Sequence, residues 1–315
     1  MKYIKDLREG DRVSDIYLCK TKNSAVTKNG KPYENLILQD KTGQIDAKVW
    51  EPNSEGIDDF SPMDYIDIFG DVTSFNGNLQ ISVKRARRCQ EGDYDAADFV
   101  PVSGRSNNDM YGELCSIVQS VKNRHLHALL KALFEDDADF VKRFRKSSAA
   151  KSVHHGFVGG LMEHTIGVAK LCDHLAETYP VLNRDLLVTA ALLHDIGKTV
   201  ELSAFPENDY TDEGQFLGHI VIGTQMAGEQ IAKLKDFPQI LKNELLHCIV
   251  AHHGKLEFGS PKKPVIPEAI ALNMADEIDA KMETFKELYD ATTTHGWLGY
   301  NRLFESYLFE TQVPE

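Results

Sequence analysis

Two domains of different structural class are expected along this chain, a small β-barrel and then an all-α domain, which together make an α+β protein. Residues 1–90 contain about five short segments of alternating apolar and polar residues and no long helical pattern. From residue 110 onward, apolar residues instead recur at the spacing of amphipathic helices. The segment between is acidic and then rich in Pro, Gly, Ser and Asn. We therefore predict domains at 1–90 and 110–315, joined by a linker at 91–109.

The N-terminal domain is expected to be a closed barrel. Its predicted strands span 12–22, 35–38, 45–50, 65–75 and 79–83. The last two flank Asn76-Gly77, a dipeptide typical of a tight hairpin. An SH3-like barrel is the alternative. We favour an OB-like barrel, because that fold has five strands, is of this size and binds single-stranded nucleic acid.

The C-terminal domain is expected to be helical almost throughout. Residues 113–133 carry apolar side chains at the period of one long amphipathic helix. Further helices are predicted at about 138–147, 160–178, 184–195, 217–235, 239–253, 267–290 and 299–309.

The composition restricts the class of protein. The 315 residues carry a net charge of −13, which excludes a generally basic protein that coats DNA. No apolar run reaches the length of a membrane span, and the N-terminus lacks the apolar core of a signal peptide. Five scattered cysteines without a C-x-x-C pair fit a reducing compartment. We expect a cytoplasmic protein that does not contact membranes.

Histidine and aspartate residues provide the chemical signal. The apolar segment Ala190–Leu193 leads into His194-Asp195, and Gly197 is expected to end this helix in the left-handed conformation. A buried His-Asp pair needs a partner that offsets the cost of removing it from water. A divalent metal such as Mn, Fe, Ni or Zn is the simplest partner, because imidazole nitrogen and carboxylate oxygen both suit it.

Four other segments supply matching groups. A single histidine in a core is more often structural than a ligand, but this explanation would have to hold separately in each segment. Recurrence on successive helices therefore favours one shared metal centre. The candidates are His164 within an apolar stripe, His219 at the start of an apolar helix, His252 and His253 at the end of another, and Asp276 one turn after Leu272.

The order His164, His194-Asp195, Asp276 resembles the H…HD…D signature of the HD superfamily of metal-dependent phosphohydrolases. The blocks HHGFVGGLMEHT and ALLHDIGKTVEL carry this resemblance. Together with the OB-like domain and the segment DYDAADFVPVS, nearly the whole chain is similar to the YhaM-type 3′-5′ exoribonucleases. The resemblance implies a helical HD-type domain whose helices direct these side chains at one centre.

The resemblance also implies two divalent ions in each chain, with manganese expected first and iron, cobalt or nickel as alternatives. His164, His194, Asp195 and Asp276 would hold one ion, and His219 with His252 the other, with Asp195 between them. Such a pair can activate a water for phosphodiester hydrolysis. His253 is a further candidate ligand. Adjacent residues of a helix point about 100° apart, so His252 and His253 reach one ion only if the helix has ended there.

Residues outside this set are candidates for catalysis and for substrate binding. Lys198 could contact a phosphate or stabilise the leaving oxygen, or simply be a favourable cation near a helix end. In the family pattern His154 and His155 border the mouth of the active site, although an exposed loop would explain them equally well.

On the barrel, a basic groove for single-stranded RNA is expected at Lys84, Arg85, Arg87 and Arg88. Tyr33, Trp50, Phe69 and Phe75 could be its stacking platforms, although barrel aromatics more often belong to the core.

Three functions are consistent with these features. The first is a metal-dependent 3′-5′ exoribonuclease that acts on single-stranded RNA, with single-stranded DNA as a further substrate, and releases nucleoside 5′-monophosphates. The second is an HD phosphohydrolase of nucleotides or cyclic dinucleotides with a regulatory barrel. The third is a non-catalytic nucleic-acid-binding protein with a structural metal centre. Self-association into a homo-oligomer is compatible with all three.

Overall fold

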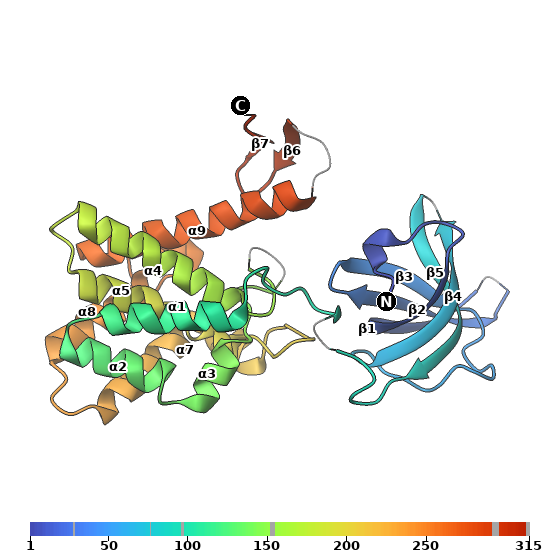
Figure 1. The fold of residues 1–315 in the computed structure, drawn as a ribbon, viewed down its shortest axis with the longest axis horizontal. Helices are drawn as coiled ribbons and strands as arrows, with labels where there is room; N and C mark the ends of the chain where they lie inside the picture. The colour runs from blue at the N-terminus through green and yellow to red at the C-terminus, as the bar shows by residue number, and fades with distance from the viewer. Residues whose placement is uncertain (28, 76, 96–97, 152–154, 292–295, 313–315) are drawn as a thin grey trace. The chain divides into compact units, whose positions relative to one another are not determined.

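The computed structural model describes the chain except for residues 28, 76, 96–97, 152–154, 292–295 and 313–315. The chain forms two compact units (Figure 1). One contains Met1–Val102 together with Ala204–Glu207, and the other contains Ser103–Ser203 together with Asn208–Glu315. Each unit is described by itself. The proposed domain limits 1–90 and 110–315 remain a prediction.

The first unit is a closed five-stranded barrel. After the 3-10 turn η1 (Ile4–Asp6), its strands are β1 (Arg12–Val26), β2 (Pro32–Asp40), β3 (Gly43–Val49), β4 (Tyr65–Phe75) and β5 (Asn78–Arg88). The strand order is β1-β2-β3-β5-β4, with β3 and β5 parallel and the other pairs antiparallel. This is the Greek-key barrel of an OB-fold, so the predicted fold is confirmed.

Alternation along the strands fills the barrel with apolar side chains. Tyr17, Ile66 and Ile81 are completely buried. On β5, Ala86 faces the core, whereas a register shift opposite Phe69 and Gly70 leaves Lys84 and Arg85 both exposed. The basic segment is therefore part of a strand rather than a loop.

A short segment after β5 packs onto the barrel. Phe99 is buried, its ring lies edge-on to Tyr65 and Tyr94, and its carbonyl accepts a hydrogen bond from Gln39 Nε2. This segment lies within residues 91–109, where the sequence predicts a linker.

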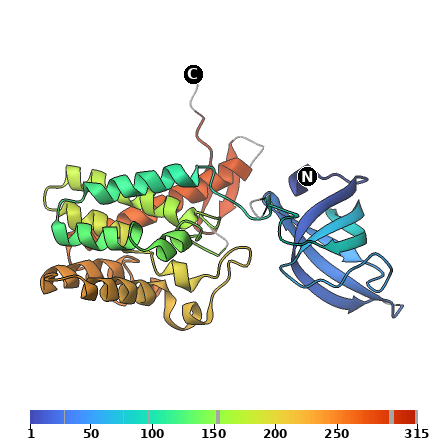
Figure 2. The same ribbon diagram turned by 60° about the horizontal axis from the view of Figure 1, so that its bottom comes forward.

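The second unit is a bundle of helices (Figure 2). Its helices are α1 (Asn107–Ser120), α2 (Arg124–Phe134), α3 (Ala138–Phe144), α4 (Gly160–Thr178), α5 (Arg184–Leu193), α6 (Lys198–Glu201), α7 (Asp212–Lys233), α8 (Gln239–Ala251) and α9 (Pro267–Ala291), with a 3-10 turn η3 (Leu256–Phe258). Helix α5 is central, because every residue from Leu186 to Leu193 is buried. It packs against α4, α8 and α9, so its C-terminal end lies inside the bundle.

Two helix predictions are wrong. The predicted helix at 113–133 is divided into α1 and α2, because Val121 is extended and the Asn123 side chain caps α2 by accepting from two backbone N–H groups. The predicted helix at 299–309 is a hairpin of β6 (Trp297–Asn301) and β7 (Ser306–Phe309). Tyr300 pairs across it with Tyr307, and cross-strand aromatic pairs of this kind favour strands.

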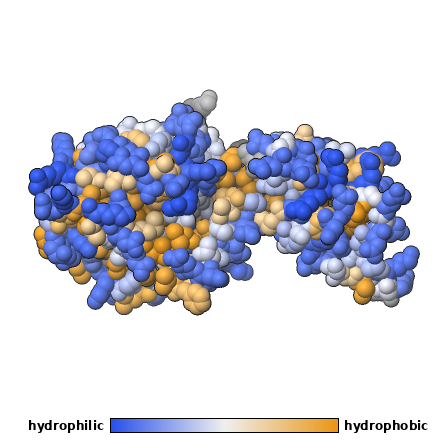
Figure 3. Space-filling model, turned by 90° about the horizontal axis from the view of Figure 1, so that it is seen from below, coloured by the Kyte–Doolittle hydropathy of each residue, from blue (hydrophilic) through white to orange (hydrophobic). Residues whose placement is uncertain are grey.

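The surface and the thiols agree with the composition. The face drawn in Figure 3 is mostly hydrophilic on both units and carries apolar patches on the helical unit. All five cysteines are free. Among the described residues, no helix combines the length and the apolar character needed to cross a membrane.

Candidate metal centre

Five helices bring their functional side chains to one place in the bundle. Helix α4 carries His164, and the end of α5 leads directly into His194 and Asp195. His219 follows a kink in α7 at Gly218, whose φ is +72°. The centre is completed by His252 and His253 just after α8 and by Asp276 and Asp279 on α9. The structure thus brings together all seven predicted metal-binding residues, which are separated by up to 112 positions in the sequence.

Asp195 lies in the middle of this centre and is only 2% exposed. Its Oδ2 is 3.6 Å from His164 Nε2 and 3.4 Å from His194 Nε2. Its Oδ1 is 3.5 Å from His219 Nε2 and 3.6 Å from His252 Nε2. Each carboxylate oxygen therefore faces a different pair of histidines, as a ligand between two ions would.

The first group contains His164, His194 and Asp276. The two Nε2 atoms lie 3.2 Å apart, and Asp276 Oδ1 is 3.2 Å from His164 Nε2 and 3.9 Å from His194 Nε2. One ligand atom from each residue lies within 4.8 Å of the others. This spacing suits a single ion with nitrogen and oxygen ligands.

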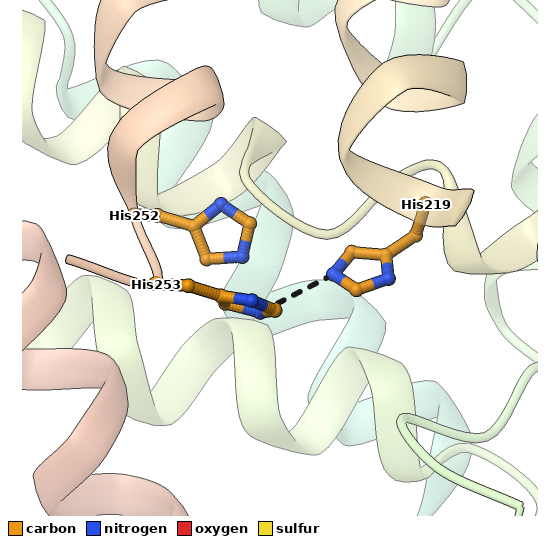
Figure 4. A group of neighbouring side chains, drawn as sticks. All are labelled: His219, His252 and His253. Atoms are coloured by element: carbon orange, nitrogen blue, oxygen red, sulfur yellow. Dashed lines mark hydrogen bonds between the residues drawn. The ribbon is translucent and has the colours of Figure 1, made fainter. Parts of the chain in front are cut away.

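The second group contains His219, His252 and His253 (Figure 4). The Nε2 atoms of His219 and His253 are 3.4 Å apart, and the rings of His252 and His253 are 4.3 Å apart between centroids. Both adjacent histidines reach the group because α8 ends at Ala251 and Gly254 adopts a φ of +75°. The geometry thus meets the condition under which both could act as ligands.

The five histidines are oriented in the same way. In each ring Nδ1 lies at hydrogen-bond distance from an oxygen, so that Nε2 is the nitrogen directed at the centre. The acceptors are Asp279 Oδ2 for His164 at 2.7 Å, Ala191 O for His194 at 2.7 Å, Glu201 Oε1 for His219 at 2.9 Å, Ile249 O for His252 at 2.7 Å and Phe258 O for His253 at 2.8 Å. A carbonyl only accepts, so Nδ1 is the protonated nitrogen there and Nε2 keeps its lone pair. Histidines that bind metals are held in this way.

Unsatisfied atoms at the centre show that a divalent cation fits these residues. Asp195 Oδ1 and His252 Nε2 are buried and have no hydrogen-bond partner among the described residues. A buried polar atom without a partner costs about 1–3 kcal/mol. The Nε2 atoms of His164 and His194 also lie only 3.2 Å apart. A cation would satisfy all of these atoms at once, whereas a further hydrogen-bond acceptor would satisfy none.

Burial and neighbouring charges set the pKa values of these groups. Burial favours neutral His164, but Asp276 and Asp279 outweigh it and raise the pKa of His164 to about 9. Burial lowers the pKa of His252 well below its usual range. Burial alone would raise the pKa of Asp195, yet the surrounding positive groups hold it well below its usual range. An ionised carboxylate and a neutral imidazole are the forms that bind metals, so Asp195 and His252 are already in these forms and an ion bound at His164 would displace a proton.

Lys198 contacts this centre through Asp195. Its Nζ is 2.6 Å from Asp195 Oδ2, and the side chain is largely buried at the start of α6. Burial alone would lower the pKa of Lys198, but the adjacent carboxylate raises it, so the ammonium stays charged. The same lysine lines the pocket that also contains His164, His253 and Asp276.

The expected conformation of Gly197 is wrong. Its φ is −61°, which is right-handed, so it does not end α5 in the left-handed conformation. A side chain is excluded for another reason, because a Cβ atom there would lie 2.1 Å from the carbonyl oxygen of His219. The glycine allows the segment after His194-Asp195 to approach the backbone of α7.

Three residues that sequence reasoning missed or placed differently support the ligands. Asp279 lies one turn after Asp276 on α9, and this spacing is the sequence signal that could have identified it. Its side chain fits only because residue 167 is a glycine, since a Cβ atom at Gly167 would lie 2.0 Å from Asp279 Oδ1. Glu201 accepts hydrogen bonds from both the backbone N and Nδ1 of His219.

His155 is buried rather than on an exposed loop, and its Nε2 lies 3.0 Å from Asp279 Oδ2. His154, the other residue assigned to substrate binding, lies outside the described residues.

The four predicted cations of the barrel are exposed on β5 and already have partners. Lys84 pairs with Asp71, Arg87 with Asp67 at 3.6 Å, and Arg88 with Asp64 at 2.9 Å. The Arg85 guanidinium lies 5.0 Å from the centre of the Phe69 ring. These contacts neutralise much of the basic segment.

Comparisons with known proteins agree with this architecture. An HD domain matches residues 161–281, which contain all seven predicted metal-binding residues. The chain is 35% identical over 277 residues to the 3′-5′ exoribonuclease YhaM of Geobacillus sp. (strain WCH70), covering 87% of this chain and 83% of that protein. Residues 161–281 of the bundle are therefore an HD domain, in a chain that also contains the OB-fold barrel. The chain belongs to the YhaM family.

Solved structures similar to the chain include two of replication protein A. One is a heterotrimer bound to ssDNA, with 19% identity, a TM-score of 0.22 and coverage of 28% of this chain and 64% of that one. The other is the second OB-fold domain from Methanococcus maripaludis, with 21% identity, a TM-score of 0.22 and coverage of 30% of this chain and all of that one.

Replacement of Asp279 by asparagine tests the support of His164. We expect Asp279→Asn to weaken Mn²⁺ binding about 10-fold or more, because Nδ1 of His164 loses its charged acceptor. Calorimetric titration of the metal-free protein with Mn²⁺ measures the change. Asp290→Asn, at an exposed position of the same helix, is the matched control and should bind as the unmodified chain does. Equal affinities in the two variants would contradict the assignment.

Proposed function

We propose that this protein is a metal-dependent 3′-5′ exoribonuclease that shortens single-stranded RNA and releases nucleoside 5′-monophosphates. The main observation is the position of Asp195, whose two oxygens face two separate groups of histidines. A YhaM relative that aligns with most of the chain carries the name of this activity. The OB-fold barrel supplies a second unit of a kind that binds single strands.

The centre would hold two divalent ions, of which Mn²⁺ is our first choice and Fe, Co and Ni the alternatives. One would be held by His164, His194, Asp195 and Asp276, and the other by Asp195, His219, His252 and His253. When bound, such a pair lowers the pKa of an attacking water and neutralises charge on the phosphoryl oxygens.

The side chains of this protein would position the substrate and balance its charge. Hydrolysis joins the oxygen of water to phosphorus and breaks the bond to the 3′ oxygen of the preceding nucleotide, which then takes up a proton. Lys198 is largely buried, charged and in contact with Asp195, so its ammonium can stabilise negative charge on that leaving oxygen. Asp279 and Glu201 keep His164 and His219 in their orientation.

Single-stranded RNA would also contact an aromatic platform on the barrel. Tyr33 and Trp50 are stacked with centroids 5.3 Å apart, and Lys48 Nζ lies 5.2 Å and 5.8 Å from the two rings. Trp50 is 44% exposed. Lys84, Arg87 and Arg88 on β5 are paired with acids, so we assign base stacking to this platform and a weaker role to the basic segment. Single-stranded DNA offers the same bases and would bind as well.

A polarity assay tests the activity. With Mn²⁺, a 5′-labelled oligoribonucleotide should give a descending ladder, and a 3′-blocked one should resist. Asp195→Asn should reduce the rate about 100-fold or more, because it removes the charge shared by both groups of histidines. Asp290→Asn, at an exposed position of α9, is the matched control. Internal cleavage, or no shortening with Mn, Fe, Co or Ni, would show that the proposed function is wrong.

Truncation of the exposed indole tests the barrel platform. Trp50→Ala should weaken binding of an oligoribonucleotide roughly 10-fold, because one stacked base is lost, while the rate at saturating RNA stays unchanged. Fluorescence anisotropy with labelled RNA measures the affinity. Val26→Ala, at another exposed apolar position of the barrel, serves as the control. An unchanged affinity would show that the platform does not bind RNA.

A further inference from the structure

A pocket opens directly onto the metal centre, and its rim combines lysines with apolar side chains. The pocket has a volume of about 410 Å³. It is lined by His164, Lys198, His253 and Asp276 of the centre, and by Lys255, Phe258, Lys281 and Leu303, which no step described above uses. We propose that these four residues form a binding site for the 3′-terminal nucleotide, in which Phe258 stacks on the base and Lys255 contacts a phosphate. This inference rests on the proposed function and names the part of the RNA that the site recognises.

The Phe258 ring is largely exposed at the edge of the pocket. It is 59% exposed, and charged residues line the pocket beside it. Its own carbonyl accepts the hydrogen bond from His253 Nδ1 at 2.8 Å. One residue therefore fixes a candidate ligand through its backbone and presents an aromatic face through its side chain.

The turn that carries Phe258 is closed by backbone hydrogen bonds. The carbonyl of Lys255 accepts hydrogen bonds from the backbone N–H groups of Phe258 and Ser260, and the carbonyl of His253 accepts one from Lys255. Gly259 follows with a φ of +85°. A platform on such a turn loses little conformational entropy when a base stacks on it.

Lys255 adds a positive charge to the rim beside the Phe258 ring. Its Nζ lies 4.9 Å from the centre of the Phe258 ring, and its anionic partner Glu257 is 3.7 Å away and exposed. An exposed pair of this kind contributes little, so a phosphate can replace it. A cation beside an aromatic face is the combination with which proteins bind single-stranded nucleic acid.

The remaining rim residues limit what can enter. Leu303 comes from the turn between β6 and β7 and is 54% exposed, while Lys281 on α9 is paired with Glu277. The volume of about 410 Å³ lies near the lower end of the range for small-molecule sites, about 300–1,000 Å³. This size suits one nucleotide, which is consistent with a site for a chain end.

Binding of single nucleotides tests the site without any turnover. In the Mn²⁺-loaded full chain, adenosine 5′-monophosphate should bind about 10-fold more tightly than ribose 5-phosphate, which lacks the base. Phe258→Ala should abolish this difference, and Phe258→Trp should restore it. Calorimetry measures both affinities. Equal affinity of the two ligands for the unmodified chain, or an undiminished difference in Phe258→Ala, would overturn the proposal.

Degradation of RNA separates this inference from the proposed function. Phe258→Ala should raise KM about 10-fold for an oligoribonucleotide with a normal 3′ end, leave kcat within about twofold, and have no effect when the 3′-terminal nucleotide is abasic. Tyr179→Ala, at an exposed aromatic position outside the pocket, should change neither value. Metal content, measured in each variant, should be unchanged. An equal loss on both substrates would overturn the rim site, whereas failure of the unmodified chain to shorten RNA would overturn only the exoribonuclease.

Discussion

The structure of the helical unit depends on the compensation of one buried charge. Asp195 is almost fully buried, and its carboxylate is ionised because the positive groups around it lower its pKa. An uncompensated carboxylate inside a bundle would cost several kcal/mol. Lys198 and four histidines, carried by α4 and α7 and by the ends of α5 and α8, lie within 3.6 Å of its two oxygens. The same carboxylate thus links the elements of the bundle and the two groups of candidate ligands.

Helix ends give the centre its geometry. Both α5 and α8 stop directly before a histidine, and that histidine donates Nδ1–H to the carbonyl three residues earlier in its own helix. The last carbonyls of a helix have no partner within it, so this bond satisfies an acceptor that would otherwise need water. It also points Nε2 of His194 and His252 away from their helices. The same hydrogen bond therefore caps the end of each helix and orients the candidate ligand that follows it.

The sequence predicted the barrel, most helices and the residues that meet at the centre, because each left a local signal. Alternation revealed the strands, and one His-Asp pair together with histidines recurring on apolar helices revealed the ligands. The support of these ligands was less visible. Asp279 acts through a space left by Gly167 on another helix, and only the packed structure brings the two together. Gly197 was noticed but explained by the wrong property, since the close approach of His219 is a tertiary contact.

The sequence shows where charged residues occur, but only the structure shows which opposite charges lie beside them. The basic segment on β5 stood out in an acidic chain, yet the antiparallel strand beside it supplies Asp67 and Asp71 as partners. Asp195, Asp276 and Asp279 add to the acidic total of the chain, yet all three face histidines. With divalent cations bound there, the local charge would favour a phosphate even though the chain carries −13. Net charge therefore predicts the behaviour of the whole surface, whereas the chemistry of this site follows from which acid lies beside which base.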